Sequence, residues 1–111
     1  MSEAATRYRK QTIERALHGA GASSGDARRA AFDNRGAAEP ARALVDKVAR
    51  TAWKVTDEDV AAVKAAGLAE DAIFELVVCA TLGQATRQLE AALAALDEAD
   101  EPDAPAAGGA P

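Results

Sequence analysis

Apolar residues recur at helical spacing through the second half of the sequence, and the longest such run lies between residues 70 and 96. After Ile73 and Phe74, the run continues in steps of three, four, three and four residues through Leu82, Ala85, Leu89, Ala92 and Leu96. Alternating steps of three and four are the heptad pattern of a helix with one apolar seam. The pattern therefore predicts one long helix whose seam packs against another helix.

Two shorter helices are predicted just before it. Pro40 suits the first position of a helix, and the apolar residues after it fall on one side as far as Trp53, which predicts an amphipathic helix. Thr56, followed by three acidic residues, is typical of an N-cap at the positive end of a helix dipole. Gly67 before Leu68 is typical of a left-handed residue that ends a helix. Residues 40–96 are thus expected to form a helical core module.

The two ends of the chain have weaker patterns. Residues 2–18 and 26–34 predict short helices, the second capped by Ser24 or Asp26, and the glycine-rich stretch 19–25 between them predicts a flexible connector. We therefore expect residues 1–39 to form a helical arm with this connector. Residues 97–111 contain only Ala, Asp, Glu, Pro and Gly, a composition that predicts a disordered acidic tail.

Composition points to an all-α protein with a small core. Alanine accounts for 31 residues, which favours helix but buries little area per side chain. No alternating run of β-branched or aromatic residues predicts a strand. Fewer than twenty apolar side chains larger than alanine lie between residues 41 and 96, so an isolated three-helix segment is short of buried surface. We therefore expect a small helical bundle assembled as a homo-oligomer, at least a dimer.

Charge excludes several partner classes. The net charge of −5 comes from five acidic residues after Leu96, and the rest of the chain is balanced. A balanced body with one Trp, one Tyr and two Phe has neither the basic stripe nor the stacking aromatics of a nucleic-acid-binding protein. No run is long and apolar enough for a membrane span, and no signal peptide is recognised. We expect a cytoplasmic protein that binds neither nucleic acid nor membrane.

Candidate catalytic residues are few. Cys79 is the only thiol, and Glu75 lies one helical turn before it. A carboxylate next to a thiol raises the thiol pKa, which opposes formation of the reactive thiolate. Cys79 is therefore expected to be a small core residue, with a reactive role as the alternative. No set of residues for the common hydrolase, kinase or dehydrogenase mechanisms is present. We therefore expect a binding or structural role in preference to an enzymatic one.

Ligand sites are also weakly indicated. Thr81, Gln84 and Gln88 form a polar stripe on the long helix, which suits a pocket or a solvated face. Trp53 is a candidate anchor for a ligand or an interface, although a single Trp on an amphipathic helix is more often a core residue. His18 has no second ligand at metal-binding spacing, and the acidic residues 57–59 are explained by the helix dipole. We expect no metal and no cofactor.

One stretch of the sequence resembles a known family. Val45 to Ala49, Val55 to Ala62 and the junction Ala65-Ala66-Gly67-Leu68-Ala69-Glu70-Asp71-Ala72-Ile73-Phe74-Glu75-Leu76, with Leu82-Gly83 and Leu89 to Leu93, resemble the carboxymuconolactone decarboxylase and alkylhydroperoxidase D-like superfamily. The resemblance covers about residues 40–96. It implies an all-helical fold and assembly as dimers, trimers or hexamers. The peroxidase branch uses a Cys-x-x-Cys pair and a histidine, but Leu82 and Thr86 stand where the second cysteine and the histidine would follow Cys79.

Three hypotheses for function follow. The leading one is a catalytically degenerate, homo-oligomeric member of this superfamily with a binding or structural role, including a small-ligand pocket between subunits. The second is a one-cysteine thiol peroxidase or redox protein that uses Cys79 with Glu75 and an external reductant. The third is an adaptor that docks on another protein through its acidic tail or its basic first helix.

Overall fold

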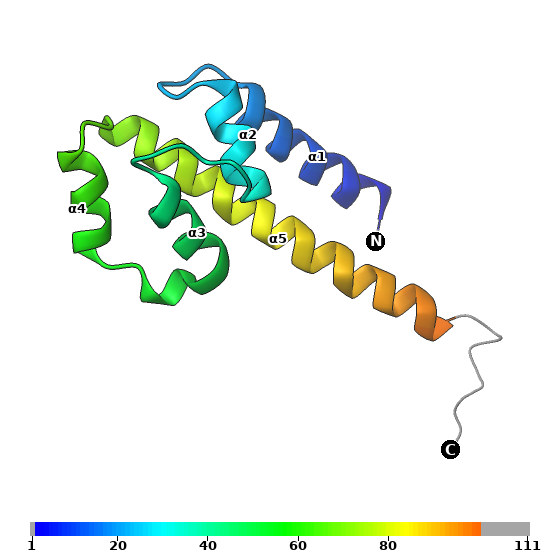
Figure 1. Cartoon of the computed structure of the whole chain (residues 1–111). Coiled ribbons are helices and arrows are strands. Elements are labelled where there is room, and N and C mark those ends of the chain that lie inside the picture. The colour runs from blue at the N-terminus through cyan, green and yellow to red at the C-terminus, as the bar shows by residue number, and fades with distance from the viewer. Residues whose placement is uncertain (1, 101–111) are drawn as a thin grey trace.

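The computed structural model describes residues 2–100, which form five α-helices and one 3-10 helix. In chain order these are α1 (Glu3–His18), α2 (Gly25–Asp33), α3 (Arg42–Thr51), η1 (Ala52–Lys54), α4 (Asp57–Ala65) and α5 (Glu70–Asp100). The long α5 is the axis of the molecule, with α1 and α2 along one side and α3 and α4 along the other (Figure 1). The last turns of α5 extend past the other helices. The described residues contain no strand, so the predicted all-α class is confirmed.

Local sequence signals set most helix boundaries. The hydroxyl of Ser24 accepts a hydrogen bond from the N–H of Ala27, which caps α2 at Ser24 and not at Asp26. Thr56 and Asp59 form a reciprocal capping box at the start of α4. These caps satisfy donors that the first turn of a helix leaves without partners.

The end of α4 follows the glycine signal in detail. Gly67 has φ of +110°, a conformation that favours glycine. Its N–H donates to the carbonyl of Lys64, and the N–H of Leu68 donates to the carbonyl of Val63. This pair of bonds is the Schellman motif, which turns the chain sharply from α4 into α5.

The hydrophobic core is not confined to residues 40–96. It forms one cluster that draws on α1, α2, the loop after α2, α3, α4 and α5, and its buried members are Leu17, Ala31, Ala37, Ala41, Leu44, Val45, Val48, Val63, Ile73, Leu76, Cys79 and Ala80. The expected N-terminal arm is therefore part of the packed body, because Leu17 and Ala31 are as buried as the residues of α3. The α2 helix lies directly against α5, where the backbone of Phe32 approaches Gly83 so closely that a Cβ at residue 83 would collide with it.

Three boundaries differ from those expected. Pro40 lies in a turn before α3, which begins at Arg42. The α3 helix ends at Thr51, so Trp53 falls in η1 and is 78% exposed instead of lying in the core. The α5 helix continues past Leu96 to Asp100, because no proline or glycine follows Gly83 until Pro102 and the intervening residues favour helix. Most of the predicted disordered tail, residues 101–111, lies outside the described residues.

Candidate functional site

Glu75 anchors the connector between α1 and α2. Its carboxylate accepts hydrogen bonds from the N–H of Ala22 at 2.8 Å, the N–H of Ser23 at 2.8 Å and the hydroxyl of Ser23 at 2.6 Å. These bonds, the Ser23 hydroxyl first, lower the pKa of Glu75 below its ordinary value of 4.5. The connector that the glycines led us to expect as flexible is thus held from a point 52 residues away. The carboxylate of Glu75 therefore holds the connector in place through three hydrogen bonds.

Cys79 lies in the core one turn further along α5. Its side chain is 1% exposed, and the thiol donates a hydrogen bond to the carbonyl of Ala16 in α1 at 3.5 Å. Burial raises the pKa of Cys79; the nearby Arg28 lowers it and Glu75 raises it by smaller amounts. Both a shielded sulfur and a raised pKa disfavour the thiolate that redox chemistry requires.

Arg28 is a structural residue that the sequence analysis did not single out. It is the one charged side chain that is buried among the described residues, and its guanidinium donates to four backbone carbonyls, those of Ala16, Gly19, Ser23 and Ser24. The carbonyls of Ala16 and Gly19 lie at the end of α1, and those of Ser23 and Ser24 lie just before α2. Arg28 and Glu75 therefore fix the α1–α2 turn from its two sides, and no local spacing in the sequence indicates this.

The four predicted ligand residues come together at one groove. Trp53, Thr81, Gln84 and Gln88 line a hollow of about 240 Å³ between the end of α3 and α5. Thr81 already donates to the carbonyl of Val77, and Gln84 accepts from Arg87. The indole of Trp53 stands at the rim and is mostly exposed. The lining mixes polar and apolar side chains, and the role of the groove as a ligand site stays a prediction.

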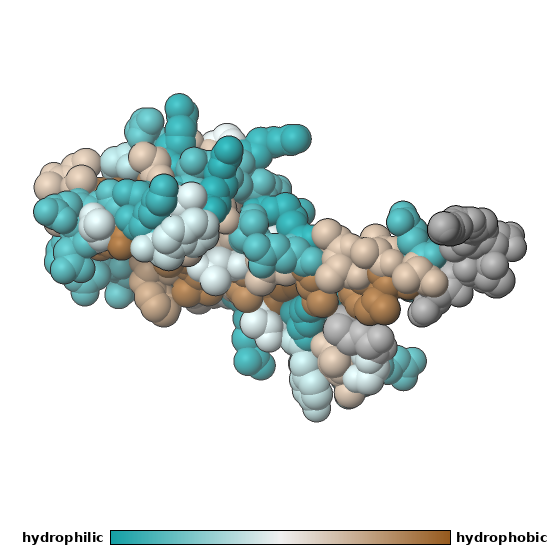
Figure 2. Space-filling view, turned by 90° about the horizontal axis from the view of Figure 1, so that it is seen from below, coloured by the Kyte–Doolittle hydropathy of each residue, from teal (hydrophilic) through white to brown (hydrophobic). Residues whose placement is uncertain are grey.

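A second surface runs along α5, and we call it the open face. At about 100° per residue its members fall within one narrow arc of the helix; they are Phe74, Val78, Leu82, Ala85, Leu89, Ala92 and Leu96. Phe74 is 69% exposed and Leu96 is 57% exposed. Figure 2 shows a row of apolar side chains along α5 toward its C-terminal end. The five seam residues predicted from the heptad spacing all belong to this face.

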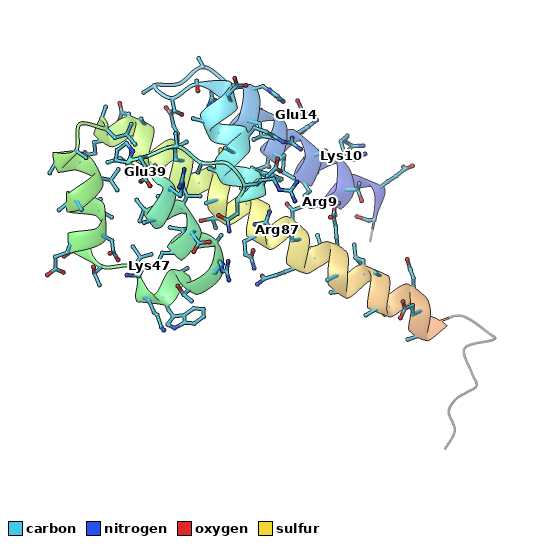
Figure 3. All side chains as sticks on the ribbon, in the orientation of Figure 1. Arg9, Lys10, Glu14, Glu39, Lys47 and Arg87 are labelled. Carbon is cyan, nitrogen blue, oxygen red and sulfur yellow. The ribbon has the colours of Figure 1, made fainter. Side chains whose placement is uncertain are left out.

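One edge of the open face is a groove between α1 and α5. The groove has a volume of about 200 Å³ and is lined mainly by apolar atoms. Its walls include Ile13 of α1 and Leu82, Ala85 and Leu89 of α5, so it is continuous with the open face. Arg9 lies at its rim, between α1 and α5 (Figure 3). The Trp53 groove borders the other edge, since Ala85 lines both hollows.

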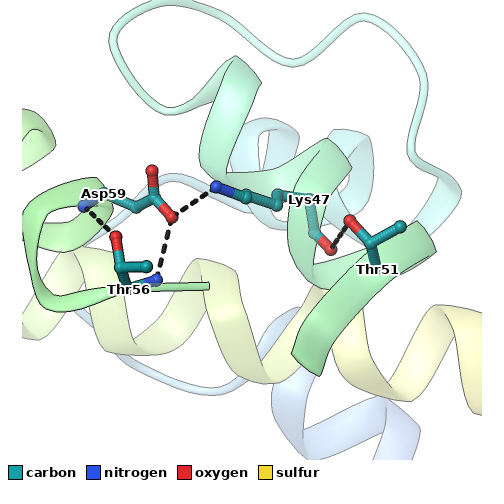
Figure 4. A network of polar contacts seen from close by, with 4 residues as sticks. All are labelled: Lys47, Thr51, Thr56 and Asp59. Atoms are coloured by element: carbon teal, nitrogen blue, oxygen red, sulfur yellow. Dashed lines mark hydrogen bonds and ion pairs between the residues drawn. The ribbon is translucent and has the colours of Figure 1, made fainter. Parts of the chain in front are cut away.

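The acidic start of α4 is used within the fold. Asp59 accepts from Lys47 Nζ at 2.7 Å and from the N–H of Thr56 at 2.9 Å, which ties α4 to α3 (Figure 4). The hydrogen bond from Lys47, followed by that from the Thr56 backbone, lowers the pKa of Asp59. His18 is exposed beside Glu14, with 3.8 Å between Nε2 and Oε1. Residues 2–100 contain no group of three or more His, Cys, Asp or Glu side chains placed to hold a metal ion.

Two further findings concern partners and relatives. Of the helices in residues 2–100, none is long and apolar enough to cross a membrane. In comparisons with known proteins, no family model, no curated protein and no solved structure matches the chain.

Proposed function

We propose that the protein is a self-associating helical protein with a binding or structural role, and that its dimer forms through the open face of α5. The observation that carries the proposal is the face itself: seven apolar positions in one line, four of them exposed, on a helix that extends past the rest of the body. Apolar stripes of this kind on a helix are usually buried against a second element.

A second copy of the chain is the occupant that fits this face. Beyond the described residues lie Met1 and residues 101–111, and the latter contain no apolar side chain larger than proline and so offer little to bury. From Leu82 to Leu96 the face alternates large and small residues, which suits close packing of two identical helices. In an antiparallel pair, the extended end of each α5 covers the body half of the other. The resemblance to the carboxymuconolactone decarboxylase-like superfamily implies the same kind of self-assembly.

The candidate catalytic residues support a role other than catalysis. Glu75 holds the α1–α2 connector through three hydrogen bonds, and Cys79 is shielded in the core. A one-cysteine redox mechanism requires an accessible thiolate, which burial and the raised pKa of Cys79 both oppose. The adaptor hypothesis would use the charged side chains of α1 or the acidic tail, whereas the apolar open face of α5 suits a second copy of the same helix.

Two neighbouring alanines provide the test. Ala92 belongs to the open face and Ala91 points about 100° away from it; both are exposed in the single chain. Ala92→Asp and Ala91→Asp have the same composition, charge and helix propensity. Light scattering at micromolar concentration should give at least twice the 11.4 kDa chain mass for wild type and Ala91→Asp. Ala92→Asp should lower the mass toward one chain with its helicity unchanged. A folded wild-type monomer contradicts the proposal.

A further inference from the structure

Arg9 brings an unpaired charge to the edge of the open face. Its Nε atom is shielded from solvent and has no hydrogen-bond acceptor, and no ion pair of Arg9 is found within residues 2–100. The side chain lies at the groove formed with Leu82, Thr86 and Leu89. The guanidinium makes no hydrogen bond within the described residues, and only Nε is shielded, so its terminal nitrogens can donate to a carboxylate of another chain.

Two unpaired carboxylates lie on the same flank of α5. Cys79 and Thr86 mark the side of α5 that faces α1, because the thiol bonds to an α1 carbonyl and Thr86 lines the α1–α5 groove. Glu90 and Asp97 follow Thr86 at four and eleven residues, which puts them on this side of the helix. Both are exposed, and neither has an ion pair or a side-chain hydrogen bond among the described residues.

Symmetry brings these charges together. In an antiparallel pair of identical helices related by a two-fold axis, each flank of one helix meets the same flank of the other. The flank that carries Arg9 therefore meets the flank that carries Glu90 and Asp97 of the second copy. The opposite ends of the two helices also overlap, so the acidic end of one α5 approaches the α1 helix of its partner.

We propose that Arg9 of each copy pairs with the carboxylates of Glu90 and Asp97 on the other copy, and that this pairing fixes the antiparallel register of the dimer. The inference rests on the proposed self-association. The apolar face supplies most of the attraction, whereas the arginine fork, which matches a carboxylate with two hydrogen bonds, selects the register and orientation.

Charge reversal tests the pairing. Arg9→Glu should weaken the dimer and raise its dissociation constant about tenfold or more. Lys10→Glu, an adjacent exposed position with the same change in charge, should have a clearly smaller effect. Combining Arg9→Glu with Glu90→Arg and Asp97→Arg should restore the affinity, since the opposite charges meet again. Analytical ultracentrifugation of the full chain measures each constant, and circular dichroism shows whether each variant is folded.

The outcomes separate this inference from the proposed function. A wild-type dimer that Ala92→Asp disrupts but Arg9→Glu leaves unchanged would overturn the pairing and keep the open face as the interface. Equal effects of Arg9→Glu and Lys10→Glu, without rescue by the triple variant, would also overturn it, because they indicate a general charge effect. A wild-type monomer would overturn both proposals.

Discussion

Gly83 is the point at which the packing of α2 on α5 is most sensitive to a single methyl group. A Cβ at this position would stand 2.7 Å from the carbonyl carbon of Phe32 and 2.9 Å from its Cα, with the carbonyl oxygen nearer still. Ordinary contacts of a Cβ begin near 3.4 Å. Because the obstructing atoms are backbone, Gly83→Ala forces α2 to withdraw along its contact with α5.

The expected cost exceeds the gain in helix propensity. Overpacking a tight contact costs about 1–3 kcal/mol, and this one also strains the bond from Arg87 Nη1 to the carbonyl of Phe32, which is 2.7 Å long. Replacing glycine by alanine inside a helix returns at most about 1 kcal/mol. We take the upper end of the overpacking range, about 3 kcal/mol, because α2 cannot shift without disturbing the core around Ala31, and therefore expect a net loss of about 2 kcal/mol.

Thermal unfolding followed by circular dichroism measures this loss. For a domain of this size, 1 kcal/mol corresponds to about 4–8 °C in Tm, so Gly83→Ala should lower Tm by roughly 10 °C. Gly25→Ala is the matched control: Gly25 also lies in a helix, and a Cβ there meets nothing within 4 Å. The control should leave Tm unchanged or raise it slightly. If Gly83→Ala melts together with Gly25→Ala, the close approach of α2 to α5 is not as described.

Three other predictions follow from the site and the caps. The pKa of Glu75 is lowered in the folded state, so its stabilising effect is present above the unfolded-state pKa near 4.5 and is lost as pH falls through the lower folded-state pKa. Glu75→Gln should therefore reduce the loss of unfolding free energy at acid pH, as measured by urea unfolding between about pH 5 and pH 2. In the folded protein at neutral pH, Cys79 should react slowly with a thiol-alkylating reagent and should not consume hydrogen peroxide, whereas in denaturant it should be alkylated quickly. Rapid labelling without denaturant would instead favour the redox hypothesis. Thr56→Ala removes the side chain that caps α4 and should lower the free energy of unfolding by about 1 kcal/mol. Thr81→Ala removes an exposed hydroxyl that bonds only to its own helix and should cost clearly less. Equal losses of unfolding free energy in chemical denaturation would argue against the capping box.

Local signals determined where the helices are. Ser24, Thr56 and Gly67 each act on backbone groups within a few residues, so their types and spacing are enough to place a helix end. The heptad spacing from Leu82 to Leu96 likewise identified one side of a helix before any partner was known, because side-chain direction follows from residue number once the helix is given. These features needed no knowledge of the rest of the fold.

Only the tertiary structure decided how those helices use their side chains. Glu75 looked like a possible partner for Cys79, yet its carboxylate accepts hydrogen bonds from Ala22 and Ser23, 53 and 52 residues away. The Cys79 thiol donates to the carbonyl of Ala16, 63 residues away. Arg28 gave no sequence signal because its acceptors are backbone carbonyls, which every residue carries. The exposure of each side chain depends on which helices pack together. Packing depends on how well the surfaces of two or more helices fit, so the residues of one helix alone do not determine it.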